Sequence, residues 1–383
     1  MQRASNIEVK KINRNRVFRF VNGRERCSNA DVAEHLGLSM PTVLTIRKEL
    51  LDAGLIHEVG EYESTGGRKA TAIAAVHDRY YALGVDITAN HISCVLTNLS
   101  GEVLKHNRVR RKFRDAPSYY QSIAAMVDQQ MQDEGIEDER FIGLGISLPG
   151  IVDRDQRTIT YSHALGIRDR ALSAITEHIS YSCTFINDAN AAALADAYHT
   201  RSRGPAVYLS LSNTVGGAII NAQSPTAFSS IDRIVHPGVN NRAGEFGHMT
   251  LFPDGTRCYC GKQGCVDVYC SAKVLSGTTG GDLKAFFDRV QGNDPQYVRT
   301  WETYLQHLAL AVNNLRMAFD CPVIIGGYVG AFVEPYINRL RTLASGLNTF
   351  EPDGRYVEPC RYTIEASALG AALTLIDLRI SLI

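Results

Sequence analysis

Residues 242–265 read RAGEFGHMTLFPDGTRCYCGKQGC, and no other stretch of the chain is as informative. It places Cys258, Cys260 and Cys265 in a C-x-C-x4-C spacing, with two glycines that let the backbone turn tightly enough for three thiolates to meet. His248 lies ten residues before the first cysteine. Three sulfurs and one imidazole complete a tetrahedral zinc site, and four protein ligands leave no open position for a substrate. We therefore predict a structural zinc; the alternative is a loop of unligated cysteines.

The same stretch carries polar side chains suited to a small ligand. Glu245 precedes His248 by three residues, so that both can lie on one face of a turn. Upstream, Asn187 and Asp188 stand where the predicted strand CTFIND runs into an alanine-rich helix. A carboxylate at the end of such a strand can accept a hydrogen bond from a hydroxyl or act as a general base. A polyol needs several oriented donors and acceptors of this kind, although an aspartate here can also be a simple helix cap.

Strand and helix patterns on either side of these motifs predict an α/β fold in two halves. From residue 80, three strand-like runs, a helix, a buried strand and a strand–helix pair follow one another, and a similar order returns from residue 206. This layout predicts a two-lobed, actin-like or ribonuclease-H-like fold with the ligand between the lobes. We assign 76–188 plus about 366–383 to the first lobe and 189–365 to the second, which carries the zinc site.

Residues 1–75 follow a different pattern, that of a winged helix-turn-helix. A helix is predicted over 7–21, then a short helix closed by Gly37, then a recognition helix from Ser39 to Ala53, and then two strands around the tip EYESTGGR. Val43, Ile46 and Leu50 are predicted to be the buried face of the recognition helix. The alternative is a small helical domain that binds no nucleic acid.

A recognition helix reads DNA with the side chains that its buried face leaves free. We expect base contacts, with more apolar than bidentate character, from its first turns, and phosphate or minor-groove contacts from basic residues around it. For each basic residue the alternative is a solvated surface charge. The predicted DNA contacts are Arg14, Arg16, Met40, Pro41, Thr42, Leu44, Thr45, Arg47, Lys48 and Arg68.

Composition is ordinary for a globular protein of several domains. The 383 residues include 40 basic and 40 acidic side chains, and this balance excludes a uniformly basic nucleic-acid coat. The predicted DNA-binding segment nevertheless has twelve basic and nine acidic residues to Ala75, which leaves +3 there and −3 in the rest. No targeting segment and no long apolar run are visible, so we expect a cytoplasmic protein with reduced thiols and no membrane contact.

Taken together, these motifs resemble the ROK family of repressors, open reading frames and sugar kinases. SLPGIVD, INDAN, RAGEFGH and CYCGKQGC follow the family's order, and LSMPTV, LLDAGLIHEVG and STGGR resemble the repressor branch. The resemblance implies that Asp188 is the counterpart of the kinases' catalytic base. It implies zinc ligands at His248, Cys258, Cys260 and Cys265. It implies sugar contacts at Ser147, Pro149, Gly150, Asn187, Asp188, Glu245, His248 and Asp267. At the last position the family usually has a longer glutamate.

Departures from the kinase pattern separate the branches. The kinases' D-x-G-G-T loop is Asp86-Ile87-Thr88-Ala89-Asn90 here, and their G-T-G loop is Ser212-Asn213-Thr214. Side chains thus replace glycines that make room for phosphate. We predict a sugar-responsive transcriptional repressor that binds operator DNA and a sugar or sugar phosphate without phosphorylating it, with Asp188 as a vestigial base. Palindromic operators imply a homodimer, or a tetramer. The alternatives are an active ATP-dependent sugar kinase with a fused DNA-binding domain and a repressor controlled by a protein partner.

Overall fold

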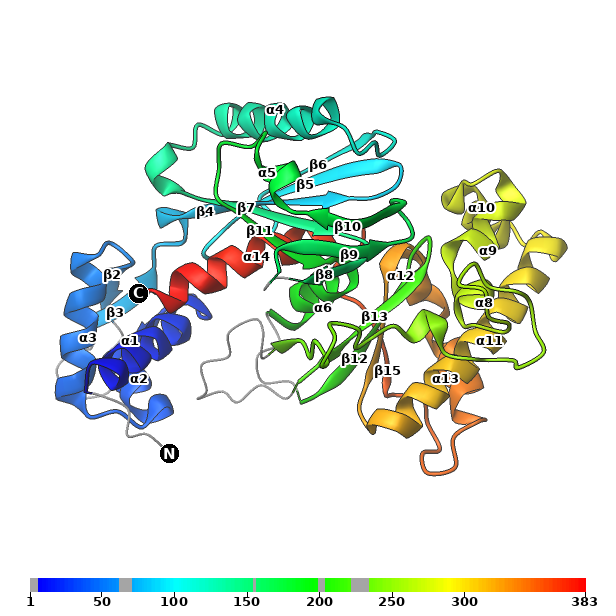
Figure 1. Cartoon of the computed structure of the whole chain (residues 1–383). Coiled ribbons are helices and arrows are strands. Elements are labelled where there is room, and N and C mark those ends of the chain that lie inside the picture. The colour runs from blue at the N-terminus through cyan, green and yellow to red at the C-terminus, as the bar shows by residue number, and fades with distance from the viewer. Residues whose placement is uncertain (1–5, 62–70, 154–155, 199–203, 222–233) are drawn as a thin grey trace.

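The computed structural model describes residues 6–61, 71–153, 156–198, 204–221 and 234–383, and its elements form an N-terminal head and two α/β lobes (Figure 1). The predicted fold class, a winged helix-turn-helix before a two-lobed α/β fold, is confirmed. Most of the predicted wing tip, with Arg68, lies outside the described residues. Within the described ranges, no helix combines the length and apolar character needed to cross a membrane.

The head follows from local signals in its sequence. Ser28 and Asp31 form a capping box, Gly37 adopts the left-handed conformation at the end of the second helix, and Ser39 caps the third. Val9 and Ile12 of the first helix are 43% and 41% exposed, whereas Val17, Phe18 and Val21 further along the same helix are buried. The elements are α1 (Asn6–Asn22), β1 (Cys27–Ser28), α2 (Asn29–Leu36), α3 (Met40–Asp52), β2 (Ile56–Glu61) and β3 (Thr71–Ala75).

The first lobe is built on a five-stranded sheet in the order β11-β7-β4-β5-β6, in which β11, β7 and β4 are parallel. One face of the sheet is covered by α4, whose apolar side chains share a core with those of the strands. A small antiparallel sheet, β10-β9-β8, was not expected from the sequence. The elements are η1 (His77–Arg79), β4 (Tyr81–Ile87), β5 (His91–Asn98), β6 (Lys105–Arg110), α4 (Pro117–Asp133), η2 (Asp138–Arg140), β7 (Phe141–Leu148), β8 (Ile151–Asp153), β9 (Thr158–Ser162), β10 (Ile167–Ala171), α5 (Ser173–Thr176), β11 (Cys183–Asn187) and α6 (Asp188–Tyr198).

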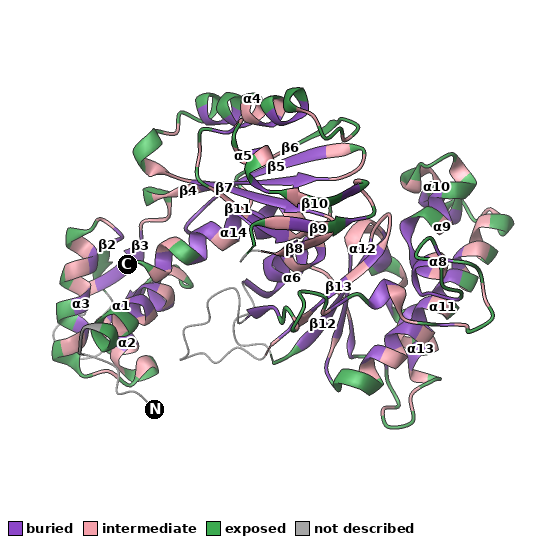
Figure 2. Cartoon of the chain, in the orientation of Figure 1, coloured by how far each residue is buried: buried purple, intermediate pink, exposed green. Residues whose placement is uncertain are grey.

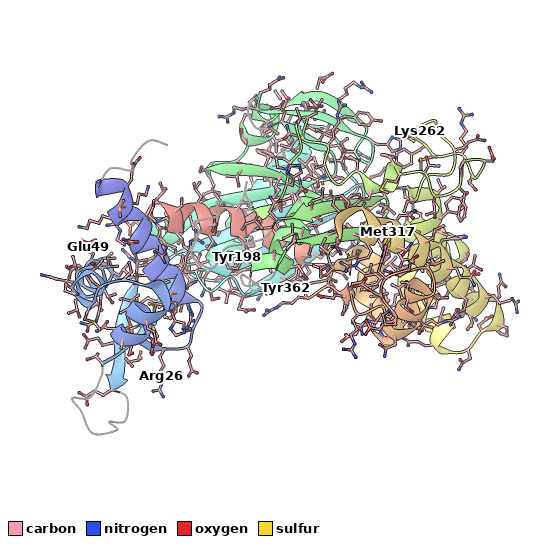
Figure 3. The ribbon with its side chains drawn as sticks, turned by 90° about the horizontal axis from the view of Figure 1, so that it is seen from below. Arg26, Glu49, Tyr198, Lys262, Met317 and Tyr362 are labelled. Carbon is pink, nitrogen blue, oxygen red and sulfur yellow. The ribbon has the colours of Figure 1, made fainter. Side chains whose placement is uncertain are left out.

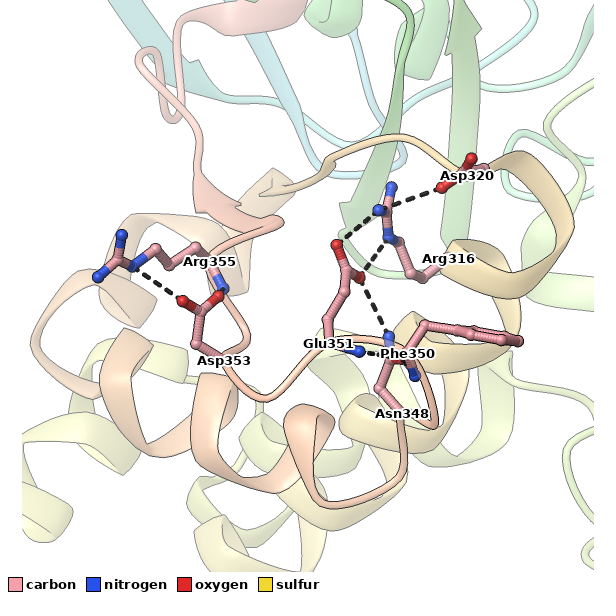
Figure 4. Close-up of polar contacts among 7 residues, drawn as sticks. All are labelled: Arg316, Asp320, Asn348, Phe350, Glu351, Asp353 and Arg355. Carbon is pink, nitrogen blue, oxygen red and sulfur yellow. Dashed lines mark hydrogen bonds and ion pairs between the residues drawn. The ribbon is translucent and has the colours of Figure 1, made fainter.

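The second lobe has a four-stranded sheet in the order β13-β12-β14-β15, with the long helix α11 packed on one face. The Arg316 guanidinium, near the end of that helix, binds Glu351 through two hydrogen bonds of 2.8 and 2.7 Å and so fixes a surface loop, from which the Phe350 ring projects (Figure 4). The elements are β12 (Ala206–Leu211), β13 (Val215–Ile220), η3 (Phe246–His248), α8 (Asp267–Cys270), α9 (Ala272–Ser276), η4 (Gly277–Thr279), α10 (Leu283–Gln291), α11 (Pro295–Phe319), β14 (Val323–Gly326), α12 (Gly327–Val333), η5 (Glu334–Tyr336), α13 (Ile337–Ser345) and β15 (Val357–Pro359).

Two helices, α6 and α14 (Ala366–Ser381), lie between the two sheets, and both are largely buried (Figure 2). Glycines allow this close packing. A Cβ added at Gly84 would meet the Ala368 carbonyl oxygen at 1.8 Å, and one at Gly370 would meet that of Ala191 at 1.7 Å. Backbone therefore lies directly on backbone where α14 crosses the first sheet and α6.

The head is docked on the far end of α14. Arg19 of α1 forms an ion pair of 2.5 Å with Asp377, and both side chains are largely buried. The Arg14 guanidinium donates to the Ile383 carbonyl at 2.6 Å, and Asn22 donates to the Leu99 carbonyl at 2.6 Å. Figure 3 shows the head, with Glu49 labelled, at one end of the molecule and the second lobe at the other. The apolar cores of the head and of α14 belong to one continuous cluster.

Candidate functional site between the lobes

The site begins where β11 ends and α6 starts. The Asn187 amide donates to the Gly150 carbonyl at 3.0 Å and its oxygen accepts from the Asn190 backbone at 3.0 Å, so this side chain connects two loops. Asp188 is the first residue of α6, and its carboxylate accepts from the Ala189 backbone at 2.9 Å. The helix N-terminus thus holds this carboxylate at the cleft between the lobes.

Two adjoining pockets meet at Asp188. One, the carboxylate pocket, contains Asp188 and Glu245; the other, the loop cleft, is bordered by residues of the segments 86–90 and 212–214. Four residues line both. The carboxylate pocket is lined by Pro149, Gly150, Ile151, Tyr161, His163, Ala164, Asn187, Asp188, Ala189, Asn190, Thr214, Val215, Gly216, Gly217, Asn241, Arg242, Ala243, Gly244, Glu245, His248 and Tyr259. It therefore gathers six of the eight predicted sugar-contacting residues.

The two predicted sugar contacts that do not line the carboxylate pocket are Ser147 and Asp267. Ser147 is fully buried and its hydroxyl donates to Asp86 at 2.8 Å. Asp267 is 4% exposed and its carboxylate accepts from the Val215 backbone at 2.7 Å. Its carboxylate thus binds the backbone of Val215, a residue that lines the pocket, while Asp267 itself does not line it.

The carboxylates of the cleft are desolvated. Burial raises the pKa of Asp188 to about 6, and the nearby charge of Glu245 acts in the same direction. Burial also raises the pKa of Glu245, against the charges of His248 and Arg242, which lower it. In the loop cleft, burial and the charge of Asp188 raise the pKa of Asp86 to about 7. Oxygens held in this way are strong acceptors for a ligand's hydroxyl groups.

Two residues that line the carboxylate pocket each carry a buried polar atom without a partner. Within the described part of the chain, neither the His248 Nδ1 nor the Asn190 Oδ1 has a hydrogen-bond partner, although both are buried. Sequence reasoning had not selected Tyr161, His163, Asn190, Arg242 or Tyr259, all of which line the pocket. Spacing alone could have suggested Asn190, which lies two residues after Asp188, and Arg242, which lies three residues before Glu245.

The four predicted zinc ligands are brought together. One donor atom from each of His248, Cys258, Cys260 and Cys265 lies within 4.8 Å of the others, and the Cys260 and Cys265 sulfurs are 3.7 Å apart. Gly264 has φ +70°, and a Cβ there would meet the Phe252 carbonyl oxygen at 1.5 Å, so the turn requires glycine. Burial opposes ionisation of Cys260, but hydrogen bonds, beginning with that from the Lys262 backbone, lower its pKa. The donor set suits Zn²⁺.

The loop cleft contains side chains where a phosphate cradle would need space. Thr88 closes its own loop, because its hydroxyl accepts from the His91 backbone at 3.0 Å and donates to the His91 carbonyl at 3.1 Å. The cleft is lined by Asp86, Thr88, Ala89, Asn90, Pro149, Ala164, Asp188, Ala192, Tyr208, Ser210, Ser212, Asn213, Thr214, Lys273, Gly327, Tyr328, Thr363, Ile364, Ala366 and Ser367. Hydroxyl, amide and methyl groups thus border the cleft.

On the head, α3 leaves the expected face free. Met40, Pro41, Leu44, Thr45 and Lys48 are exposed, Thr42 is half-buried, and the predicted buried residues are buried. Several of the predicted basic contacts also have partners within the chain. Arg47 pairs with Glu58 of β2, and Arg16 donates to the Leu36 carbonyl at 2.9 Å. Arg14 is bound to the end of the chain, as described above.

Comparisons with known families match both parts of the chain. The ROK family model matches residues 82–377, which is most of the chain, and a winged helix-turn-helix DNA-binding model matches residues 15–57. The xylose repressor of Bacillus subtilis is 28% identical over 272 residues, 70% of this chain and 67% of the relative. The transcriptional dual regulator NagC of Escherichia coli is 27% identical over 262 residues, 68% of this chain and 62% of the relative.

Solved structures share the fold. A ROK family transcriptional regulator, a homologue of the E. coli MLC protein, superposes with a TM-score of 0.74 at 22% identity and covers 98% of both chains. The ROK glucokinase of Streptomyces griseus, in complex with glucose and AMPPNP, gives a TM-score of 0.63 at 22% identity over 76% of this chain and 98% of its own. The regulator's match includes the head, whereas the kinase's match covers a smaller share of the chain.

Proposed function

Because the chain belongs to the ROK family, we propose that it is a sugar-responsive transcriptional regulator, a repressor of genes for carbohydrate use. The head binds operator DNA, and the carboxylate pocket binds a sugar or sugar phosphate without phosphorylating it. The observation that supports this most directly is the combination of a winged helix-turn-helix and a polyol-type pocket in one chain, as expected for relatives that are named repressors.

The pocket's chemistry supports a sugar. Asp188 and Glu245 supply acceptors for ligand hydroxyls, and Arg242 and the Asn190 amide add polar groups of other kinds around the same space. Asn187 is occupied by Gly150 and Asn190, so it positions the Pro149–Gly150 turn and leaves the neighbouring Asp188 facing the ligand. Many oriented polar groups around a concave site are what sugar recognition requires.

Phosphoryl transfer is not expected, and this separates the proposal from its main alternative, a sugar kinase with a DNA-binding head. Asp188 keeps the residue type and the place of a catalytic base. The two segments that line the loop cleft, however, carry Thr88, Ala89 and Asn90 on one side and Ser212 to Thr214 on the other, in place of the glycines that leave room for phosphate in the kinase pattern.

A structural zinc is part of the proposal. His248, Cys258, Cys260 and Cys265 would hold it, and when bound it would supply a rigid cross-link between the pocket wall and the cysteine loop. One imidazole nitrogen of His248 would bind the metal, while the rest of the ring would remain at the pocket wall, which links the cysteine loop to the ligand.

Signal transfer is proposed to run through α14. The Ser367 hydroxyl at its start donates to the Asp188 carbonyl at 3.1 Å, and Asp377 near its end pairs with Arg19 of the head. A ligand that closes the lobes would move this helix and reorient the heads of a homodimer, or of a tetramer, on a palindromic operator. With operator DNA as partner, the expected location is the cytoplasm.

The test combines DNA and sugar binding. Operator fragments selected from random DNA should bind the full chain, and one member of a panel of pentoses, hexoses and N-acetyl sugars, with their phosphates, should change that affinity. Lys48→Ala should weaken operator binding and reduce the slope of log K against log salt by about 0.9, because one phosphate contact is lost. Lys284→Ala, on the exposed surface of α10, is the matched control.

Two results would contradict the proposal. A saturating sugar that leaves operator affinity unchanged would remove the sugar response and favour control by a protein partner. Turnover of any panel sugar with Mg-ATP at the rate of a true sugar kinase would establish the alternative, and Asp188→Asn would then abolish that turnover.

A further inference from the structure

Two aromatic rings, one from each lobe, stack on each other in the lining of the carboxylate pocket. His163 lies in the loop between β9 and β10 of the first lobe, and Tyr259 lies between two of the cysteines in the second. Their ring centroids are 4.0 Å apart and their planes differ by 9°, which is a face-to-face stack. Both residues line the pocket. The stack therefore joins the lobes directly beside Asp188 and Glu245.

The first-lobe ring is held by the turn that forms the pocket floor. The Ser162 hydroxyl donates to the Pro149 carbonyl at 2.5 Å and accepts from the Leu165 backbone at 3.2 Å, which fixes the loop on both sides of His163. The Tyr161 hydroxyl lies 3.4 Å from the His163 Nδ1. Because Pro149 adjoins Gly150, the acceptor of the Asn187 amide, this loop is connected to the pocket floor by hydrogen bonds.

The second-lobe ring is held by the cysteine loop. The Tyr259 hydroxyl lies 3.4 Å from the His248 Nε2, and the two rings meet edge to face with centroids 5.4 Å apart. Tyr259 nevertheless keeps 42% of its surface exposed. Tyr259 is thus held between His163 and His248 but is not part of the core. We infer that it affects the entry and exit of a ligand more than the stability of the fold.

We propose that His163 and Tyr259 form an aromatic clasp over the carboxylate pocket, which separates to admit the effector and closes to retain it. The effector is thereby of a class with an apolar C–H face as well as hydroxyls, as a pyranose has, because an aromatic ring packs against such a face. The inference rests on the proposed function, since the retained ligand is its sugar effector. Its signature is kinetic: opening the clasp speeds release of the ligand.

Release rates test the clasp, with D-xylose, D-glucose and N-acetylglucosamine as probe sugars in stopped-flow or surface-plasmon measurements. His163→Ala and Tyr259→Ala are each expected to raise the dissociation rate constant about two- to tenfold, the size of a stacking interaction. His163→Phe keeps the stack and should stay close to the native rate, which separates stacking from hydrogen bonding. Phe350→Ala, on an exposed loop of the second lobe, is the control.

A second readout needs no ligand. The chain's single tryptophan, Trp301, is 2% exposed, so a His163→Trp variant supplies the tryptophan that acrylamide can reach. The new indole should be shielded by Tyr259. Adding Tyr259→Ala in the same background should raise its quenching constant about twofold as the indole loses its stacked neighbour.

The outcomes are separable. Native release rates in both alanine variants, or equal rates for His163→Phe and His163→Ala, would overturn the clasp. Should the native chain bind none of the probe sugars, the sugar-binding part of the proposed function fails for them and the quenching experiment alone decides on the clasp. An indole at position 163 that is quenched equally with and without Tyr259 would then overturn it.

Discussion

At the scale of single residues, the cleft contains buried carboxylates whose charged form is destabilised by burial. Asp86 is 6% exposed and accepts from the Ser147 hydroxyl, yet no positive side chain is hydrogen-bonded to it among the described residues. Its carboxylate is therefore held by one neutral donor in a poorly solvated place, close to a second carboxylate at Asp188. Natural chains retain such groups at sites where binding or catalysis uses them.

Asp86→Asn should make the fold more stable at high pH. Because the folded pKa is raised from 3.8 to about 7, the folded chain holds a proton that the unfolded chain has released, so stability is lost as pH rises from about 4 to about 7. The amide cannot ionise and its oxygen still accepts from Ser147. We expect a gain of roughly 1–4 kcal/mol at pH 8 that shrinks toward zero near pH 4.

Urea unfolding of both chains at pH 4, 5 and 8 measures this difference. Asp288→Asn, on the exposed surface of α10, is the control and should show no such pH dependence. An Asp86→Asn effect of equal size at pH 4 and pH 8 would exclude the proposed titration.

At the scale of elements, local rules predicted what is local. The helices of the head carry their caps and their spacing in sequence, so α1, α2 and α3 fall within a residue or two of the predicted bounds. The strands β8, β9 and β10 were missed because they are short and partly exposed, and an alternation of three to five residues gives no clear period. The cysteine cluster was readable because its ligands lie close in sequence.

The pocket could be predicted only in part, because some of its residues lie in local motifs and others are brought together only by tertiary packing. Asp188, Glu245 and His248 stand in recognisable motifs, whereas His163 and Tyr259 meet only through the packing of one lobe on the other. Nothing in the sequence around Asp267 indicates that its carboxylate would bind the Val215 backbone, since that contact depends on where β13 lies. Sequence gives the type of chemistry, and tertiary structure decides which atoms reach the ligand.

Removal of one cysteine ligand should loosen the whole loop from 258 to 265. Cys258→Ser is expected to lower bound zinc from about one per chain toward none and to reduce the free energy of unfolding by several kcal/mol, because metal binding is part of the folding free energy. Metal content after denaturation and thermal melting with and without a chelator measure the two effects. Cys183→Ser, outside the cluster, is the matched control; a chelator-insensitive native chain with no bound zinc would contradict the assignment.

At the scale of the whole molecule, α14 connects the two functions. Its first residues border the loop cleft, its middle lies against the sheet and α6, and its last turns carry the head. In the signal transfer proposed above, this closely packed helix moves as a rigid body and carries a small displacement at Asp188 to the head.

Asp377→Asn should uncouple the sugar response from DNA binding. It replaces the carboxylate that faces the largely buried Arg19 guanidinium with a neutral amide, which costs about 3 kcal/mol and weakens one of the contacts that hold the head on α14. The sugar-induced change in operator affinity should shrink toward none, while sugar affinity measured without DNA stays native. Fluorescence anisotropy of labelled operator, with and without sugar, gives the coupling factor.

A double replacement controls for simple loss of stability. Arg19→Met with Asp377→Leu removes the buried charges together and restores apolar contact, so the chain should regain stability without regaining the ionic link. Asp288→Asn, which breaks an exposed pair on α10, should leave the coupling unchanged. A fully retained sugar response in Asp377→Asn would show that coupling does not run through this contact.

The place of α14 in the chain also orders the events of synthesis. Of the described elements, those of the head are the first to leave the ribosome and their docking partner α14 is the last. Gly84, Gly145 and Gly370 let this helix pack backbone to backbone on β4, β7 and α6. The head can therefore take up the docked position described above only after residues 366–381 have been synthesised. A chain that ends before residue 366 would contain the DNA-binding head but not the helix on which the head docks.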